Sequence, residues 1–225
     1  MFLRGRLGHS RLTMLMQRLR VVRRLICQQH LFAYFAYGAL LVDRLLTLSR
    51  ADTGQAKLSI DIVDIPELAE EIAEQLGVLA EERQQSIDVH FEIVPKWIGD
   101  RVVLRQALLN LVDNAIKYSP VGGKIAVRVA QTGDGTIIDV SDTGSGIPAE
   151  LQSRIFDRFY RVDKARSRQN GGTGLGLAIA KWAVEANGGS LTLQPANGAG
   201  SCFRITLPQT ATSTTIAAHT AAASH

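Results

Sequence analysis

Apolar residues recur at helical spacing through the first fifty residues, and positions 10–49 contain no proline. Two stripes, Leu12–Ile26 and Leu41–Leu48, carry this pattern. The spacing predicts one long helix, or two helices that bend around Gln28-Gln29-His30. A segment of this length cannot bury an apolar stripe alone, so pairing of two chains through residues 10–50 in a homodimer is the simplest solution. Residues 51–55 end the pattern and are expected to form a linker.

Beyond the linker, short alternating runs predict strands and a period of 3.6 residues predicts helices. The expected strands are 58–63, 87–93, 124–130, 136–140, 191–194 and 202–207. The expected helices start after Asp64, run from Asp100 to Tyr118 and from about Leu175 to Asn187, with a short helical insert at 151–160. Because strands and helices alternate while hairpins join neighbouring strands, the pattern predicts an α/β fold with a mixed sheet covered by helices. The Thr/Ala/Ser-rich residues 209–225 are predicted to be a disordered tail.

Charge separates the helical segment from the rest of the chain. Residues 1–50 contain nine arginines and one acid, Asp43, for a net charge of +8. The remaining residues hold 16 basic and 20 acidic side chains, for a net charge of −4. A basic helix could contact an anionic membrane surface or nucleic acid, although a solvated helix face explains the same charges. We expect no nucleic-acid partner, because the globular part is not basic.

Two further features bear on the cellular setting. Cys27 and Cys202 are far apart and have no metal-ligating residues at suitable spacing, which favours a reducing, cytoplasmic environment. The longest uncharged apolar run, Leu31–Val42, has 12 residues, whereas a membrane-spanning helix needs about 20. No small-residue cleavage site follows a compact apolar core, so we expect neither a membrane span nor a signal peptide.

The expected helix 100–118 carries a polar stripe beside its apolar face. Asn110, Asn114 and Lys117 recur at i, i+4 and i+7, so their side chains lie on one side of the helix. Asparagine carbonyl oxygens suit Mg²⁺, which prefers a few protein oxygens together with phosphate oxygens. Lys117 could supply a point charge to phosphate. The alternative is a solvated face with two ordinary asparagines.

A glycine-rich segment, Gly171–Leu177, leads directly into the last expected helix. Glycine N–H groups next to a helix N-terminus form a site for anions, because the first N–H groups of a helix lack partners. The segment lacks the Gly-Lys-Ser/Thr ending of a P-loop, and no strand leads into it as in a dinucleotide fingerprint. A flexible linker is the alternative, and the amphipathic helix that follows argues against it.

Asp142-Thr-Gly-Ser-Gly146 follows a strand-like run and places one carboxylate between glycines. Glycines allow the backbone to approach a flat ligand closely. An ionised Asp142 could accept a hydrogen bond from an exocyclic amine such as that of adenine. A polar hairpin turn is one alternative, and the active site of an aspartic protease, which has the same Asp-Thr-Gly-Ser spelling, is another.

Between these glycine segments, residues 155–163 place aromatic side chains every three or four positions. Such spacing is most often packing of a small core. This segment and the residues that follow it could also fold as a lid over bound phosphates, because they contain Arg158, Arg161, Arg166 and Arg168.

In their order along the chain, these segments resemble the four nucleotide-binding motifs of sensor histidine kinases. Asn110–Ser119 is similar to the N box, Asp142–Pro148 to the first glycine box, Phe156–Arg161 to the F box and Gly172–Leu177 to the second glycine box. The resemblance covers roughly residues 58–208. It accounts for four motifs, whereas the protease interpretation accounts for one.

The resemblance implies a two-layer α/β sandwich of the Bergerat type, with ATP and Mg²⁺ bound under a mobile lid. It implies that Asn110 and Asn114 face Mg²⁺ and the phosphates, that Lys117 binds phosphate, that Tyr118 packs near adenine and that Asp142 receives the adenine amine. The other residues expected to contact the nucleotide or shape the pocket are Gly144, Gly146, Ile147, Phe159, Arg161, Gly172, Thr173, Gly174, Leu175, Gly176 and Leu177.

Leu40–Gly54 resembles the second helix of the family's dimerisation hairpin. The first helix departs from the family pattern, because the phosphoacceptor segment His-Glu-Leu-Arg-Thr-Pro-Leu does not occur. His9, followed by Leu12, Thr13 and Leu15, is the candidate phosphoacceptor. His30 lies only 13 residues before Asp43, near a possible turn, and is the poorer candidate.

The implied organisation is a helical dimerisation and phosphoacceptor region at 1–55, a kinase ATP-binding domain at 56–208 and a tail at 209–225. The implied activity moves the γ-phosphoryl group of ATP to a histidine and then to an aspartate on the receiver domain of a response regulator. Two alternatives stay open: an ATP-binding pseudokinase or regulatory partner without its own phosphoacceptor, and a serine kinase of the anti-sigma type.

Overall fold

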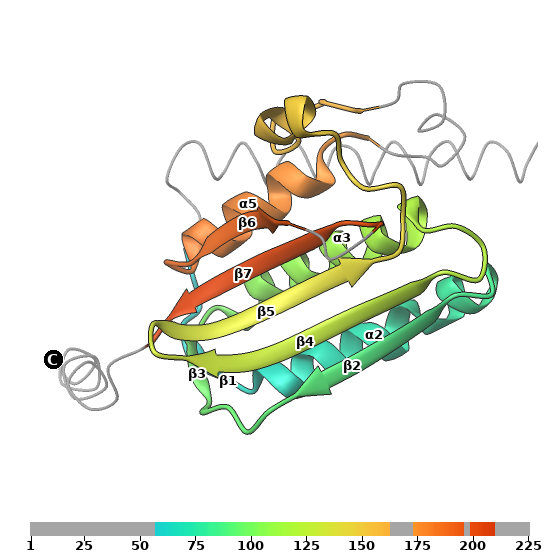
Figure 1. Cartoon of the computed structure of the whole chain (residues 1–225). Coiled ribbons are helices and arrows are strands. Elements are labelled where there is room, and N and C mark those ends of the chain that lie inside the picture. Colours follow the sequence, from blue (N-terminus) through green and yellow to red (C-terminus); the bar gives the residue numbers. More distant parts are fainter. Residues whose placement is uncertain (1–56, 163–172, 196–198, 210–225) are drawn as a thin grey trace, which may run out of the picture. The chain divides into compact units, whose positions relative to one another are not determined.

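The computed structural model describes residues 57–162, 173–195 and 199–209 (Figure 1). The predicted helices of residues 10–50 and the predicted tail lie outside these residues, apart from Gln209. The described elements in chain order are β1 (Asp61–Val63), α2 (Ile65–Glu81), β2 (Ser86–Phe91), β3 (Trp97–Gly99), α3 (Arg101–Tyr118), β4 (Lys124–Thr132), β5 (Gly135–Asp142), the 3-10 helix η1 (Ala149–Arg154), α5 (Gly176–Ala186), β6 (Ser190–Gln194) and β7 (Cys202–Pro208).

Two helices begin where the capping residues in the sequence predict. The carboxylate of Asp64 accepts a hydrogen bond from the backbone N–H of Glu67 at the start of α2, at 3.2 Å. The carboxylate of Asp100 accepts from Val103 N–H at the start of α3, at 2.9 Å. Each bond satisfies an N–H group that has no partner inside the helix. Of the apolar residues that recur at helical spacing in α2, Leu68, Ile72 and Leu76 are buried, whereas Leu79, which we also expected to be buried, is 45% exposed.

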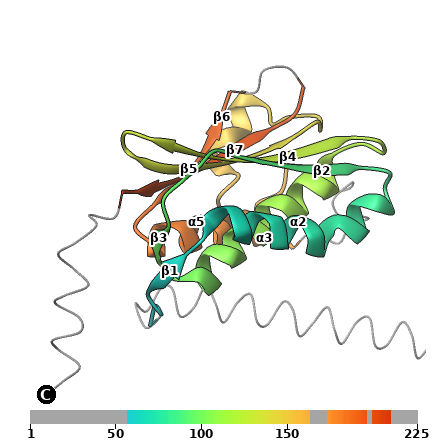
Figure 2. The ribbon, with the colours of Figure 1, turned by 90° about the horizontal axis from the view of Figure 1, so that it is seen from below.

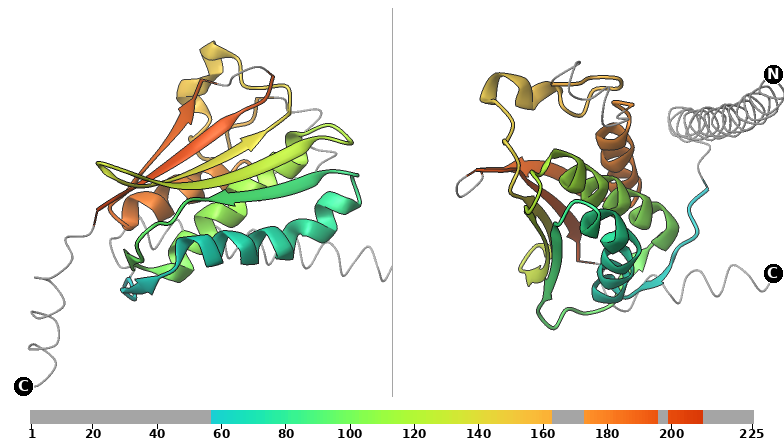
Figure 3. Two further views of the ribbon diagram at one scale, coloured as in Figure 1. Left: turned by 60° about the horizontal axis from the view of Figure 1, so that its bottom comes forward. Right: turned by 90° about the vertical axis from the view of Figure 1, so that its right-hand side faces the viewer.

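Five strands form one sheet in the order β2-β4-β5-β7-β6. β2 pairs with β4 in parallel, and the other neighbours are antiparallel. Helices α2, α3 and α5 lie along one face of this sheet (Figures 2 and 3). The side chains that fill the space between sheet and helices are apolar, and on the strands they include Ile125, Val127, Val129, Ile138, Val140, Phe203, Ile205 and Leu207. The predicted α/β class and the mixed sheet covered by helices are confirmed.

The opposite side of the sheet, which we call the outer face, carries polar side chains. A row crosses four strands at one level, with Arg128 opposite Asp139, Asp139 opposite Arg204 and Arg204 opposite Thr192. The two faces differ because successive side chains of a strand point to opposite faces of the sheet.

Three local predictions need correction. β3 was not expected, because its three residues, Trp97–Gly99, are too few to show alternation; the strand pairs with β1 in a separate two-stranded sheet. β1 begins at Asp61 and not at 58, since Ser59 N–H donates to the carboxylate of Asp100 at 2.7 Å. The insert expected at 151–160 is a 3-10 helix at 149–154, followed by turns; 3-10 helices stay short because their side chains eclipse one another.

Among the described residues, no helix combines the length and the hydrophobicity that a bilayer span requires.

Candidate functional site

The polar stripe of α3 faces the start of α5. Asn110 is 3% exposed, and its Nδ2 donates to the carbonyl of Gln106 at 2.8 Å. This bond fixes the amide plane and directs Oδ1 toward Gly176, where an added Cβ would lie 3.2 Å from that oxygen. Asn114 lies one turn further along α3 and is half-buried. The structure therefore brings the predicted N-box residue Asn110 to the predicted second glycine box.

Lys117 lies in the last turn of α3. Its ammonium group is 2.5 Å from the carboxylate of Asp113, one turn back on the same helix. Both side chains are 25% exposed. The ion pair holds the positive charge near the C-terminal end of α3, which is the favourable end of the helix dipole for a cation.

Asp142 ends β5 on the side of the strand that faces the helices, in the same row as Ile138 and Val140. Its Oδ1 accepts hydrogen bonds from Gly144 N–H at 2.7 Å and from Ser201 N–H at 3.3 Å. Burial raises the pKa of the Asp142 carboxyl above its ordinary value, and the hydrogen bonds with Gly144 and Ser201 partly oppose that rise. Asp142 is thus a carboxylate held by amides near an apolar layer.

Gly144 joins the Asp142 turn to the end of α3. An added Cβ at Gly144 would lie 2.7 Å from both the carbonyl oxygen of Tyr118 and Oδ1 of Asp142, so only glycine fits. Gly146 has a φ of +72°, in the left-handed region that favours glycine. Gly146 and Ile147 also line a cavity of about 500 Å³ together with residues of η1 and of the β6–β7 connection.

The predicted F box and second glycine box meet through Phe159 and Gly174. Phe159 N–H donates to Gly174 C=O at 2.8 Å. Both residues have a left-handed backbone, with φ of +63° for Phe159 and +71° for Gly174, and an added Cβ at Gly174 would lie 2.8 Å from the carbonyl carbon of Phe159. A left-handed phenylalanine is strained, and such strain is concentrated at functional segments.

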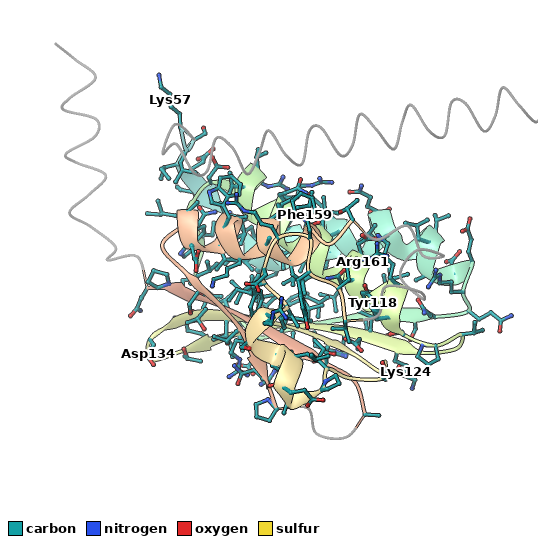
Figure 4. The ribbon with its side chains drawn as sticks, turned by 90° about the horizontal axis from the view of Figure 1, so that it is seen from above. Lys57, Tyr118, Lys124, Asp134, Phe159 and Arg161 are labelled. Carbon is teal, nitrogen blue, oxygen red and sulfur yellow. The ribbon has the colours of Figure 1, made fainter. Side chains whose placement is uncertain are left out.

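Arg161 follows two residues later and carries buried nitrogen atoms. Its Nε and Nη2 have no hydrogen-bond partner in the part of the chain that the structure describes. Buried donors are nearly always paired in proteins, so these two nitrogen atoms suit an acceptor that the described residues do not supply. Figure 4 labels Arg161, Phe159 and Tyr118, which come from the segment after η1 and from the end of α3.

The remaining predicted residues divide into two groups. Leu175 is fully buried, and Thr173, Gly176 and Leu177 are half-buried around the start of α5. Four predicted residues lie outside the described residues: His9, Arg166, Arg168 and Gly172.

Gly200 and Ser201 belong to the site but were missed by the sequence analysis. Gly200 has a φ of +116°, and an added Cβ would lie 1.9 Å from the carbonyl oxygen of Asp142. The adjacent Ser201 supplies one of the two amides that hold the Asp142 carboxylate. The signal in the sequence was Gly198-Ala199-Gly200-Ser201 directly before the last strand, a pattern that indicates close approach of two backbones.

Comparisons with known proteins agree with this geometry. Residues 99–211 match the family described as histidine kinase-, DNA gyrase B- and HSP90-like ATPases. The sensor-like histidine kinase SenX3 of Mycolicibacterium smegmatis is 38% identical over 169 residues, which cover 75% of this chain and 44% of that protein. The sensor histidine kinase WalK of Bacillus subtilis is 38% identical over 176 residues, covering 75% of this chain and 28% of WalK.

Solved structures give the same result. Full-length ShkA in complex with AMPPNP superposes with a TM-score of 0.67 at 30% identity, over 75% of this chain and 35% of ShkA. The Acinetobacter baumannii histidine kinase AdeS has a TM-score of 0.63 at 25% identity, over 76% of this chain and 77% of the AdeS chain.

The chain spans less than half the length of SenX3 and WalK. The family match starts just before α3 and extends past β7, so it includes the three meeting points described above: Asn110 with Gly176, Tyr118 with Gly144 and Phe159 with Gly174. The resemblance to sensor histidine kinases is confirmed, and so is the Bergerat-type fold. The chain belongs to the histidine kinase-, DNA gyrase B- and HSP90-like ATPases, and it carries the catalytic ATP-binding domain of a sensor histidine kinase.

Proposed function

We propose that the chain binds Mg²⁺ and ATP between α3, the Asp142 turn and the segment Phe159–Leu177, and that it acts as the kinase of a two-component signalling system. The observation that carries the proposal is the meeting of four motifs, distant in sequence, at one end of the sheet. Each meeting is a close contact at a glycine: an added Cβ would clash at Gly144 with Tyr118 and at Gly174 with Phe159, and would be tight at Gly176 against Asn110.

The adenine base would be recognised by Asp142. Both backbone donors of this carboxylate bind Oδ1, and an exocyclic amine would add a donor to a carboxylate whose charge is poorly solvated. A hydrogen bond to a charged group is worth about 1.5–3 kcal/mol. Gly144 and Gly146 allow the base to approach the backbone, and Ile147 and the half-exposed ring of Tyr118 would provide apolar contacts.

The asparagines of α3 fit a magnesium ion. The Oδ1 of Asn110 is oriented by the bond that its Nδ2 makes to Gln106, and Asn114 adds an amide oxygen one turn away. Two neutral protein oxygens leave the other positions to phosphate oxygens and water, as Mg²⁺ prefers. The ion, when bound, would offset phosphate charge. Lys117 would add a positive charge from the next turn.

The phosphates would be held by backbone N–H groups at the start of α5 and by the lid. Gly172, Thr173, Gly174 and Gly176 precede or begin that helix, whose first N–H groups favour an anion. The Nε and Nη2 of Arg161, which have no partner among the described residues, are donors suited to a phosphate oxygen.

In the proposed reaction, the bond between the γ-phosphorus and the β–γ bridging oxygen breaks, and a bond forms between that phosphorus and a histidine nitrogen. ADP is the leaving group. A neutral imidazole attacks without a strong base, and its N–H proton passes to solvent. We propose His9, in the same chain or in a second copy paired through residues 10–50, as the acceptor, and an aspartate on a response-regulator receiver domain as the next acceptor. The proposed setting is the cytoplasm, with the basic residues 1–50 able to contact a membrane surface.

One observation favours a second candidate function. The sequence contains no His-Glu-Leu-Arg-Thr-Pro segment, so the chain could bind ATP and regulate a kinase that supplies the phosphoacceptor.

Labelling with γ-labelled ATP distinguishes these functions. We expect acid-labile label on the wild-type chain and none on His9→Gln. Absence of label on the wild type, with nucleotide affinity intact, would favour the regulatory function. Acid-stable label would indicate a serine kinase.

The metal assignment has its own test. Asn114→Ala should abolish Mg²⁺-dependent nucleotide binding, measured by titration with and without the ion. Unchanged affinity would remove Asn114 from the metal site.

A further inference from the structure

The turn between α2 and β2 contacts the C-terminal end of α3. The last four carbonyl groups of an α-helix have no partner inside the helix and must be satisfied from elsewhere. In α3 these carbonyls belong to the turn that carries Lys117 and Tyr118. Ser119 N–H donates to Ala115 O, and the donors for Ile116 O and Lys117 O come from Arg83 and Gln85, two polar residues of the turn before β2.

Gln85 is 6% exposed, and its side-chain amide points at the end of α3. Its Nε2 lies 3.1 Å from Ile116 O, 3.2 Å from Ser119 O and 3.0 Å from Pro120 O. The two N–H bonds of this amide therefore face three carbonyls around the end of the helix, and one of them is shared between two acceptors. Loss of the donor would leave buried acceptors unsatisfied, which costs more than a hydrogen bond normally contributes.

Arg83 adds a positive charge to the same end. Its Nη1 lies 3.1 Å from Ile116 O and 3.3 Å from Lys117 O. A cation near the last turn also interacts favourably with the helix dipole. Two backbone hydrogen bonds also join the turn before β2 to the segment that follows α3. Gly122 N–H donates to Arg83 O and Ser86 N–H donates to Gly123 O, both at 3.2 Å.

The left-handed residue Gln84 aims Gln85 inward. Gln84 has a φ of +56°, and Gln85 N–H donates to Ala80 O at 2.9 Å, so the chain closes α2 and reverses. Such a residue normally ends a helix as glycine. Here a strained glutamine occupies the position, and the next side chain enters the interior.

We propose that Arg83 and Gln85 are positioning residues for nucleotide binding. They act through the last turn of α3, where Lys117 carries the charge assigned to phosphate and where the Tyr118 carbonyl limits the space around Gly144. Neither residue is assigned a contact with nucleotide. The inference rests on the proposed ATP site, which the last turn of α3 borders.

The test is Gln85→Met, which keeps the length of the side chain and removes its donors. Two quantities are measured where all variants are fully folded: the dissociation constant for Mg·ATP, and the amide exchange rate of Ser119, whose N–H donates to Ala115 O. We expect affinity to fall by about fivefold to tenfold, the equivalent of one or two neutral hydrogen bonds, and exchange at Ser119 to accelerate. Arg83→Met should change both quantities in the same direction by less.

Two control variants separate positioning from general stability. Asp139→Asn weakens an ion pair on the outer face and should lower the melting temperature without changing Mg·ATP affinity. Gln84→Gly keeps both donors, relieves the left-handed strain and should raise the melting temperature by about 4 °C, again with unchanged affinity.

Failure of this inference differs from failure of the proposed function. If the wild type binds Mg·ATP and both Gln85→Met and Arg83→Met bind it equally well, the positioning role is overturned. If the wild type does not bind nucleotide, the proposed function is wrong. If the amide exchange rate of Ser119 is the same in Gln85→Met as in the wild type, the positioning role is overturned, whether or not the wild type binds nucleotide.

Discussion

Strand β5 carries two aspartates, three residues apart, on opposite faces of the sheet. One is paired with a cation and the other is held by backbone amides. On the outer face, Asp139 is 8% exposed and is bound in a fork by Arg204, with Nε to Oδ1 and Nη2 to Oδ2 both at 2.7 Å. At the helix-facing end, Asp142 has two amide donors on Oδ1, and burial raises the pKa of its carboxyl. The hydrogen bond with Asp139 raises the pKa of Arg204 in turn, as expected for a satisfied pair.

The difference separates a structural carboxylate from a binding carboxylate. In the bidentate ion pair both carboxylate oxygens of Asp139 already accept hydrogen bonds from Arg204, so Asp139 does not need a ligand to satisfy its charge. Asp142 faces the helix layer and has no cationic partner among the described residues, so part of its desolvation is uncompensated until a further donor binds it. Burial alone does not identify a site on this strand; the kind of partner does.

Among the tests of this comparison, Asp142→Asn should have the largest effect. The amide oxygen can still accept from Gly144 and Ser201, so the turn should keep its shape. The charge that attracts an exocyclic amine is removed, and affinity for Mg·ATP should fall by about 10- to 100-fold, because hydrogen bonds to charged groups contribute about 1.5–3 kcal/mol. Isothermal titration measures this change. Unchanged affinity would contradict the comparison between the two aspartates.

Arg204→Met should act on stability and not on binding. The substitution leaves Asp139 buried without its cation. A fully buried pair would lose about 3–5 kcal/mol, but the Arg204 side chain is 35% exposed, so solvent screening reduces the expected loss to about 1–2 kcal/mol. Urea denaturation measures the loss. A change in Mg·ATP affinity in this variant would show that the two regions are coupled.

The smallest effect is a pH dependence that follows from the raised pKa of Asp142. The folded-state pKa of Asp142 is raised above its ordinary value of 3.8, so the folded protein holds this proton more tightly than the unfolded chain. Below pH 3.8 both states are protonated and the shift has no effect on stability. As pH rises through 3.8 and then through the raised pKa, stability is lost, and the full loss persists above it.

Asp142→Asn removes this loss. The variant should therefore match the wild type in acid and become more stable than the wild type at neutral pH, which denaturation at several pH values can test. In the wild type, nucleotide affinity should fall as pH drops through the raised pKa. If the variant and the wild type differ in stability by the same amount at every pH, the difference does not come from the titration of Asp142.

The sequence predicted elements whose signals are local. Asp64 and Asp100 cap helices where expected, and the residues of the polar stripe lie on the helix α3, as expected. Helix periodicity and capping depend on residues only a few positions apart. The three close contacts of the site were predicted only as motifs in order. Their distances depend on the pairing of β5 with β7 and on how α3 and α5 pack.

The features that the sequence did not predict either depend on contacts between residues far apart in the chain or have no signal in the local composition. Ser201 lies 59 residues from the carboxylate it helps to hold, and no local rule joins them. Gln85 is polar and follows a helix, so it reads as a solvated turn residue, although it is buried. Gln84 and Phe159 are left-handed without being glycine, which propensity alone does not predict.

The order of strands also determines when during folding the site can form. β4 and β5 are joined by a tight connection, and hairpins of this kind form in about 1–10 μs. β7 is separated from β5 in the sequence by η1, α5 and β6, so its pairing with β5 is non-local, and such pairing is the slow part of folding mixed α/β domains. The Ser201 amide reaches Asp142 only with that pairing. We therefore expect the ability to hold a nucleotide to appear last, after most of the sheet and the α3 helix have formed.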